Sequence, residues 1–119
     1  MNLNAKRILL TGAAGGIGRL LSDLLADRGA YLGLVDRDLT AVTALAKSLD
    51  GKASGSLPLV ADITKAEDRE RVVRRMHEAF GGIDILINLA GILDFKRFQD
   101  SDPGVIQRIL QVNFYCNHS

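Results

Sequence analysis

The chain has 119 residues, of which 47% are hydrophobic and 24% are charged, a balance typical of one globular domain over residues 1–119. Its 15 basic and 14 acidic residues give a net charge of +1, which provides no electrostatic basis for binding nucleic acid. The single cysteine, Cys116, excludes an internal disulfide, and with only His118 nearby it does not indicate a metal site. No stretch approaches the roughly 18 apolar residues of a membrane span, so we expect a cytoplasmic protein.

A strand, a glycine-rich turn and a helix open the chain. The short apolar run 6–11 predicts a strand, and the turn GAAGGIG (12–18) follows it directly. Residues 17–28 have the apolar spacing of a helix, which Gly29 is suited to end. We expect the core-facing stripe of this helix to be Ile17, Leu20, Leu21, Leu24 and Leu25.

The same alternation continues along the chain. Strands are predicted over 31–36, 57–61 and 83–91. Helical stripes lie between them, first Leu39, Val42, Leu45, Ala46 and Leu49, closed by Gly51, and then Val72, Val73, Met76, Ala79 and Phe80. The segment Thr64-Lys65-Ala66-Glu67 has the pattern of a capping box that opens the second of these helices. Asp102-Pro103 begins a last helix, which is still in progress where the sequence ends.

Strands that alternate with helices of this length predict an α/β fold with a doubly wound parallel sheet of Rossmann type, in three layers. The usual strand order of such sheets, 3-2-1-4, places the third strand at an edge, where Pro58 removes no needed hydrogen bond. The fourth strand is apolar on both faces, as expected of a strand that helices cover on both sides.

The turn at 12–18 has the composition of a phosphate-binding loop. Glycine permits a tight turn and lets the backbone approach a pyrophosphate closely. The helix that follows offers free amide groups and a positive dipole end to that anion. A plain flexible turn is the alternative interpretation, but the strand–turn–helix context favours the phosphate loop.

Asp36 ends the second predicted strand, which comes after the glycine-rich turn and the first predicted helix. A carboxylate there can accept hydrogen bonds from both hydroxyls of an adenosine ribose; the alternative is that Asp36 or Asp38 only caps the next helix. Arg37 is suited to a 2′-phosphate, as in NADP. However, a carboxylate about 4 Å from that phosphate costs on the order of 4 kcal/mol at an effective dielectric near 20. We therefore expect NAD rather than NADP.

The motif Thr11-Gly12-Ala13-Ala14-Gly15-Gly16-Ile17-Gly18 matches TGxxxGxG, the signature of the short-chain dehydrogenase/reductase family, which the chain resembles up to about Tyr115. Three further matches follow in the family's order. Asp62-Ile63 resembles the acidic–aliphatic pair that contacts adenine, and Asn88-Leu89-Ala90-Gly91 resembles the NNAG motif that closes the fourth strand. Asn113 is similar to the helix asparagine of the family's catalytic tetrad.

The resemblance implies a set of cofactor-binding residues, namely Thr11, Gly12, Ala14, Gly15, Gly16, Ile17, Gly18, Asp36, Arg37, Asp62, Ile63, Asn88, Ala90 and Gly91. Each match also has a plainer interpretation. Asp62 can simply end the strand, Asn88 and Gly91 can lock the turn that follows, and Asn113 alone would be an ordinary polar residue of a helix. Leu89 departs from the family pattern, in which a second asparagine stands at that position.

The resemblance also implies hydride transfer between nicotinamide and a carbonyl or alcohol substrate. In the family a tyrosine is the general acid/base, assisted by a lysine four residues later. Here Tyr31 and Tyr115 are followed at that spacing by Val35 and Ser119, so the YxxxK motif is absent. We therefore expect a truncated, cofactor-binding part of such an enzyme, with an incomplete sheet, inactive alone and prone to self-association.

Two other classes of function stay open. The chain can be a non-catalytic dinucleotide-binding or interaction module, because it lacks the catalytic tyrosine and lysine. A Rossmann-like methyltransferase also pairs a glycine loop with an acidic residue after the second strand. The TGxxxGxG spacing and the Asn88-Ala90-Gly91 motif argue against a methyltransferase, and no residue of the sequence identifies a substrate.

Overall fold

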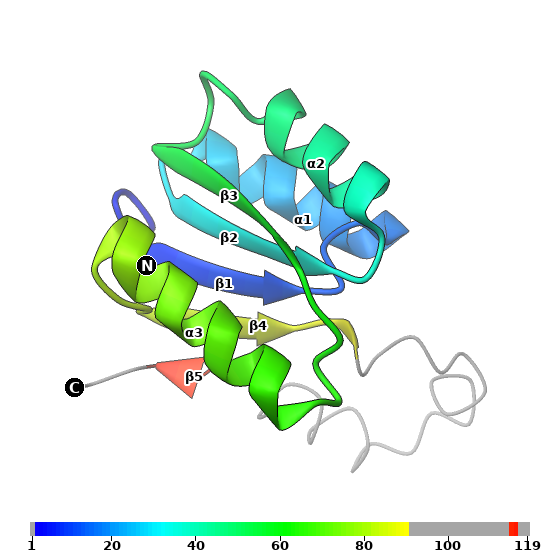
Figure 1. Ribbon diagram of the computed structural model, residues 1–119. Coiled ribbons are helices and arrows are strands. Elements are labelled where there is room, and N and C mark those ends of the chain that lie inside the picture. Colours follow the sequence, from blue (N-terminus) through cyan, green and yellow to red (C-terminus); the bar gives the residue numbers. More distant parts are fainter. Residues whose placement is uncertain (1, 91–114, 117–119) are drawn as a thin grey trace, which may run out of the picture.

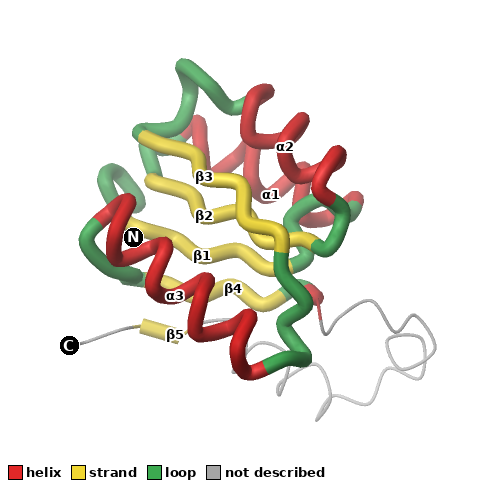
Figure 2. Tube along the Cα trace, in the orientation of Figure 1, coloured by secondary structure: helices red, strands yellow, loops and turns green. Residues whose placement is uncertain are grey.

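The computed structural model describes residues 2–90 and 115–116, which form a five-stranded sheet with helices on both of its faces. In Figure 1, α1 and α2 lie behind the sheet and α3 lies in front of it. The tube in Figure 2 shows the strands side by side between these two helix layers. The elements are β1 (Arg7–Thr11), α1 (Gly16–Asp27), β2 (Tyr31–Asp36), α2 (Leu39–Ser48), β3 (Gly55–Val60), α3 (Ala66–Phe80), β4 (Ile85–Asn88) and β5 (Tyr115–Cys116).

The strand order is β3-β2-β1-β4-β5, and the first four of these strands pair in parallel. This confirms the predicted α/β class and the 3-2-1-4 order. Among the described strands β3 pairs only with β2, and Pro58 is exposed on it, where its missing amide costs no ladder hydrogen bond. β4 is shorter than the strand predicted over 83–91, because its ladder with β1 ends at the pair Thr11–Asn88.

The sequence did not predict β5. Tyr115 and Cys116 pair antiparallel with Leu86 and Ile85 of β4. An open strand edge presents unpaired amide and carbonyl groups, which explains why an extended segment pairs there. The prediction of a helix in progress at the end of the sequence is therefore wrong at Tyr115–Cys116, and the predicted helix start at 102–103 lies outside the described residues.

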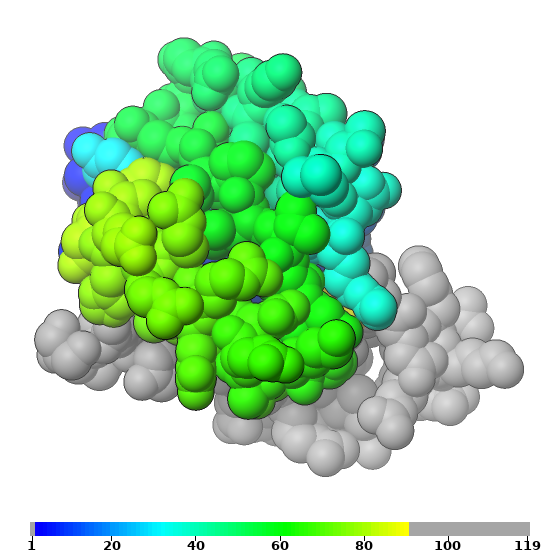
Figure 3. Space-filling model, in the orientation of Figure 1, coloured from blue at the N-terminus to red at the C-terminus, as the bar shows by residue number. Residues whose placement is uncertain are grey.

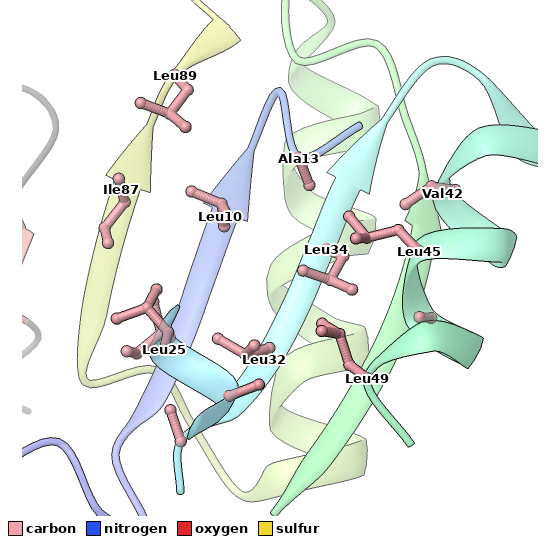
Figure 4. Packing of buried hydrophobic residues seen from close by; sticks show 14 of the residues in the cluster. Leu10, Ala13, Leu25, Leu32, Leu34, Val42, Leu45, Leu49, Ile87 and Leu89 are labelled. Carbon is pink, nitrogen blue, oxygen red and sulfur yellow. The ribbon is translucent and has the colours of Figure 1, made fainter. Parts of the chain in front are cut away.

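Apolar side chains pack against both faces of the sheet, which is why its central strands lack the alternation of a half-exposed strand. The cluster shown in Figure 4 lies between the sheet and helices α1 and α2, and it includes Ile8, Leu10, Leu25, Leu32, Leu34, Val42, Leu45, Leu49 and Ile87. The cluster on the α3 side consists of Leu9, Val35, Leu59, Ala61, Val72, Met76 and Ile83. Each large aliphatic side chain that is fully buried contributes roughly 1.5–3 kcal/mol to stability.

The face of α1 that contacts the sheet differs from the predicted stripe. Its buried residues are Gly18, Ser22, Leu25 and Ala26. Of the predicted stripe, Ile17, Leu20 and Leu24 are instead exposed, by 57%, 65% and 48%. Small residues let the helix approach the sheet closely, and the buried Ser22 hydroxyl donates to the Gly18 carbonyl oxygen (2.6 Å), so its burial leaves no unpaired polar group. The buried face of α1 is therefore determined by how closely the helix packs against the sheet, and not by hydrophobicity alone.

The stripes predicted for the other two helices are confirmed in the main. The residues found buried are Val42, Leu45, Ala46, Leu49, Val72 and Met76. Leu39, Val73 and Ala79 are exposed, which narrows each stripe relative to the prediction. No helix within residues 2–90 has both the length and the apolar character needed to cross a membrane.

The capping box predicted at 64–67 is wrong. Helix α3 begins at Ala66, and its N-cap, Lys65, makes no side-chain hydrogen bond to the helix. The Thr64 hydroxyl donates instead to Asp62 Oδ1 (2.6 Å), within the loop that precedes the helix. The helix therefore begins one residue later than predicted, because Thr64 bonds to Asp62 within the loop and does not cap the helix.

An ion pair joins the start of β1 to the turn before β4, at the amino ends of these strands. Arg7 Nε and Nη2 donate to Asp84 Oδ2 and Oδ1 at 3.0 and 2.9 Å, and the Arg7 backbone amide donates to Oδ2 at 2.8 Å. The bonds from the Arg7 side chain are the main cause that lowers the pKa of Asp84 to about 2. The pair therefore fixes this end of the sheet as long as Asp84 is ionised.

We predict that Asp84→Asn lowers the free energy of unfolding at neutral pH by on the order of 1 kcal/mol, a modest value because both side chains are partly exposed to solvent. The pKa of Asp84 is lower in the folded state than in the unfolded state. Its contribution is therefore complete above 3.8 and is lost as the pH falls toward about 2. Urea unfolding of both proteins across this range should show the difference shrinking, and an undiminished difference at low pH would contradict the assignment.

Candidate cofactor-binding site

A cleft of about 360 Å³ opens at the edge of the sheet where the carboxyl ends of the parallel strands meet. It is formed by the turn after β1, the end of β2, the loop after β3 and the end of β4. Figure 1 shows these strand ends converging on the right-hand side of the molecule. The lining residues are Gly12, Val35, Asp36, Arg37, Ala61, Asp62, Ile63, Thr64, Asn88 and Ala90.

The turn between β1 and α1 is closely packed and carries almost no side chains. Gly12 has a φ of 69°, and a Cβ there would lie 2.9 Å from the Ala90 backbone nitrogen. The Ala13 amide donates to the Val35 carbonyl oxygen (3.0 Å), which ties the turn to β2. The N-cap of α1 is Gly15, and among the described residues no side chain caps the first helical turn. The amide groups at this helix end are therefore open to an anion.

Two glycines at the start of α1, Gly16 and Gly18, differ in their surroundings. A Cβ at Gly18 would overlap the carbonyl oxygens of Gly12 and Ala13 and would lie 2.7 Å from the Ala13 carbonyl carbon, so this glycine lets α1 pack onto the turn. A Cβ at Gly16, by contrast, would have no atom of the described residues within 4 Å beyond its chain neighbours and the backbone of its own helix. The packing of the chain itself does not require glycine at position 16, and its missing side chain leaves open space at the helix end.

Asp36 holds its carboxylate between β2 and the glycine turn. Its Oδ2 accepts from the Ala14 amide (3.0 Å) and its Oδ1 from the Asp38 amide (3.1 Å). The cap of α2 is Asp38, whose Oδ1 accepts from the Ala41 amide (3.1 Å). Asp36 is thus not needed as a cap, and its half-buried side chain links the end of β2 to the turn and lines the cleft.

The loop after β3 brings a second carboxylate to the cleft. Asp62 Oδ1 accepts from the amide and the hydroxyl of Thr64 at 3.0 and 2.6 Å. These hydrogen bonds lower the pKa of Asp62, so the side chain is ionised at neutral pH. The side chain of Arg37 is 79% exposed, and its Nη2 lies 3.8 Å from Asp62 Oδ2. The two side chains therefore approach each other from the end of β2 and from the loop after β3.

A hydrogen bond joins the ends of β1 and β4. The Thr11 hydroxyl donates to Asn88 Oδ1 at 2.5 Å, and Thr11 is almost fully buried. The Leu89 amide donates to the Thr11 carbonyl oxygen (3.1 Å), and the Leu89 side chain is buried in the core. Leucine at this position, a departure from the family pattern, is therefore accommodated by packing.

The predicted site residues gather at this cleft and at the turn beside it. Those that line the cleft are Gly12, Asp36, Arg37, Asp62, Ile63, Asn88 and Ala90. Those in the adjoining strand end, turn and first helical residues are Thr11, Ala14, Gly15, Gly16, Ile17 and Gly18. Two predicted residues, Gly91 and Asn113, lie outside the described residues.

Sequence reasoning missed three residues of the cleft. Val35 and Ala61 are apolar residues at strand ends, and nothing in the sequence separates them from the core. Thr64 was interpreted as a helix cap, although its place two residues after an aspartate is typical of a local side-chain turn. Within residues 2–90 and 115–116, no three or more His, Cys, Asp and Glu side chains gather as they would around a metal ion.

The sequence profile described as short chain dehydrogenase matches residues 6–116, nearly the whole chain. The chain belongs to the short-chain dehydrogenase family. This confirms the resemblance carried by the TGxxxGxG motif at 11–18. The parallel sheet and its strand order agree with the fold of solved members of the family.

The chain matches a part of several longer proteins. The 11-beta-hydroxysteroid dehydrogenase-like 6 of Arabidopsis thaliana is 40% identical over 118 residues, which cover 96% of this chain and 34% of that protein. The structure of 3-ketoacyl-(acyl-carrier-protein) reductase from Brucella melitensis, complexed with NADH, has a TM-score of 0.65 and 31% identity, covering 72% of this chain and 33% of that one. L-Sorbose reductase from Gluconobacter frateurii, complexed with NADPH and L-sorbose, has a TM-score of 0.66 and 30% identity. The match covers 74% of this chain and 34% of that one. The chain spans about a third of the length of these three proteins.

We predict opposite effects of alanine at two glycines of the short-chain dehydrogenase motif. Gly18→Ala should lower the free energy of unfolding by about 1–3 kcal/mol or more, because α1 must move away from the turn. Gly16→Ala should leave it unchanged or raise it by up to about 1 kcal/mol, because alanine favours the helix and meets no neighbouring atom. Urea unfolding measures both, and equal destabilisation by the two variants would contradict the packing described for the turn.

Proposed function

We propose that the cleft binds NAD and that the chain forms the cofactor-binding part of an oxidoreductase acting on a carbonyl or alcohol substrate. The observation that carries this proposal is the position of Asp36. Its carboxylate accepts from the Ala14 amide at 3.0 Å, within the turn that leads into the uncapped N-terminus of α1. A dinucleotide requires this combination, an acceptor for its ribose hydroxyls beside amide groups for its diphosphate.

Each segment of the cleft has a separate task in this proposal. The first amides of α1 hold the diphosphate, and the absence of a side chain at Gly16 gives it room. Asp36 exchanges its bonds to backbone amides for bonds to the ribose hydroxyls. Asp62 and Ile63 contact the adenine, while the backbone at the end of β4 and just after it, at Asn88 and Ala90, passes close to a ribose of the cofactor. The nicotinamide ring itself supplies or takes up the hydride; the residues of this chain bind and orient it.

The charge of Asp36 favours NAD over NADP. A 2′-phosphate about 4 Å from this carboxylate would be repelled by on the order of 4 kcal/mol at an effective dielectric near 20, before screening by salt. Arg37 offsets little of this repulsion, because it is exposed and lies near Asp62. The solved relatives include one complexed with NADH and one complexed with NADPH, so family membership alone does not decide the cofactor.

The proposed hydride transfer needs a general acid/base that the described cleft does not contain. Tyr31 is the first residue of β2, at the strand end opposite the cleft, where its ring centroid lies 5.2 Å from that of Phe80. Neither Tyr31 nor Tyr115 is followed by lysine four residues later. We therefore propose that this chain alone binds cofactor without turnover, with Asn113 as the one catalytic residue that its sequence contributes.

A non-catalytic dinucleotide-binding module is a second candidate, and the same absence of the YxxxK motif favours it. Both candidates predict saturable binding of NADH by the 119-residue chain. An assay of NADH formation from NAD and secondary alcohols tests whether the chain alone is inactive, as both candidates require. Turnover at a rate above that of a heat-denatured sample would contradict this part of the proposal.

We predict that the chain binds NAD at least about tenfold more tightly than NADP, a difference of 1.4 kcal/mol or more. Asp36→Ser should weaken NAD binding and reduce the preference, because the ribose acceptor and the repelling charge are both removed. Asp38→Asn is the matched control: it removes the same charge two residues away and keeps an oxygen for the α2 cap. Isothermal titration calorimetry measures all six affinities. Equal affinities of the unaltered chain for NAD and NADP would contradict the assignment of Asp36.

We also predict that Gly16→Ala, although folded, binds NAD about tenfold or more weakly than the unaltered chain. The added methyl group occupies the open space at the start of α1, where the proposal places the diphosphate. Calorimetry on this variant, with its unfolding curve as the control for folding, checks the result. Unchanged affinity would place the diphosphate away from this helix end.

A further inference from the structure

The loop that follows β3 is held by side chains of the first two turns of α3. Arg71 Nη2 donates to the Val60 carbonyl oxygen (2.8 Å), and Arg69 Nη1 donates to the Ile63 carbonyl oxygen (2.7 Å). Between them, Asp68 Oδ2 accepts from the backbone amide of Asp62 (2.8 Å). In Figure 3 the green atoms of this loop and of α3 form one continuous surface on the near face.

The bond to Asp68 supplies the acceptor for the Asp62 amide at the point where the loop leaves the sheet. The Ala61 amide still donates to the Asp36 carbonyl oxygen (3.1 Å) of the neighbouring strand, so up to this residue the loop follows the sheet. At Asp62 the chain turns toward α3, and the Asp62 amide takes the Asp68 carboxylate as its acceptor. A partly buried amide without an acceptor would be costly, so the direction in which residue 62 leaves the sheet depends on Asp68.

Asp62 lines the cleft, and its two carboxylate oxygens differ in their contacts. Its Oδ1 accepts from both the amide and the hydroxyl of Thr64. Within residues 2–90, its Oδ2 accepts no hydrogen bond and lies 3.8 Å from the exposed Arg37 guanidinium. An ionised carboxylate oxygen accepts from the amino group of a base and repels a carbonyl oxygen at the same position.

We infer that Asp68 is a positioning residue for base recognition: through the Asp62 amide it aims the Asp62 carboxylate at the 6-amino group of adenine. This inference rests on the proposed binding of NAD and extends it to a residue that does not touch the cofactor. Arg71 supports the same arrangement, since its Nη2 lies 3.7 Å from Asp68 Oδ1 while it donates to Val60.

The test compares NAD with nicotinamide hypoxanthine dinucleotide, in which a carbonyl oxygen replaces the 6-amino group. We expect the unaltered chain to bind NAD roughly tenfold more tightly than the hypoxanthine analogue, since a hydrogen bond to a charged acceptor is replaced by repulsion. Asp68→Ala should bring this ratio close to one. Asp68→Asn should keep most of it, because the asparagine Oδ1 can still accept from the Asp62 amide.

The matched control is Glu67→Gln. Glu67 lies in the same first turn of α3, is exposed, and contributes the same charge near the helix N-terminus. If Asp68 acted only as a charge on the helix dipole, Glu67→Gln and Asp68→Asn would change the affinity ratio as much as Asp68→Ala. Amide hydrogen exchange without any nucleotide gives a second measurement: the Asp62 amide should lose protection in Asp68→Ala and keep it in Glu67→Gln.

The outcomes separate this inference from the proposed function. A lowered ratio in Asp68→Ala, with the ratio kept in Asp68→Asn and Glu67→Gln, supports the positioning role. An unchanged ratio in a folded Asp68→Ala variant, or unchanged protection of the Asp62 amide, overturns the inference while NAD binding stands. Failure of the unaltered chain to bind NAD would overturn the proposed function, and adenine recognition through Asp68 with it.

Discussion

The close approach of α1 to the turn after β1 is the constraint on which the rest of the site depends. Gly18 lets the helix pack directly onto the carbonyl groups of Gly12 and Ala13. The turn is then tied to β2 by the bond from Ala13 to Val35 and by the Asp36 carboxylate on the Ala14 amide. One arrangement therefore fixes both the open helix end and the acidic residue beside it, and the geometry needs no side chain from the turn itself.

Polar side chains join β1 to β4 at both ends of these strands, and the proposed cofactor cleft lies at one of the two ends. At the amino ends, Arg7 and Asp84 fasten β1 to the approach of β4. At the carboxyl ends, Thr11 and Asn88 join the same two strands beside the cleft. The apolar clusters on both faces of the sheet keep these ends in register, as expected of a doubly wound sheet whose ligands bind beyond the strand ends.

The sequence predicted the features that depend on local chemistry. The alternation of strands and helices, the glycine turn and the place of Asp36 follow from short segments whose residues act together, and the strand order follows from the usual order of such sheets. The prediction for the buried face of α1 is wrong, because small residues such as Gly18 and Ser22 are buried where the helix lies close to the sheet. The distance between helix and sheet cannot be inferred from a single segment of the sequence. The hydrogen bond from the Asp62 amide to Asp68 was not predicted for a similar reason, since Asp62 lies in the loop after β3 and Asp68 in α3.

An NMR titration of the nitrogen-15-labelled chain with ADP-ribose tests the central claim most directly, because this ligand contains the diphosphate, the ribose and the adenine that are proposed to contact the start of α1, Asp36 and Asp62. The account predicts saturable shifts at the amides of Gly12, Ala14 and Gly16 and in the loop at Asp62, with little change near Arg7. Shifts confined to the end of the sheet around Arg7 and Asp84, or no saturable shift, would contradict it.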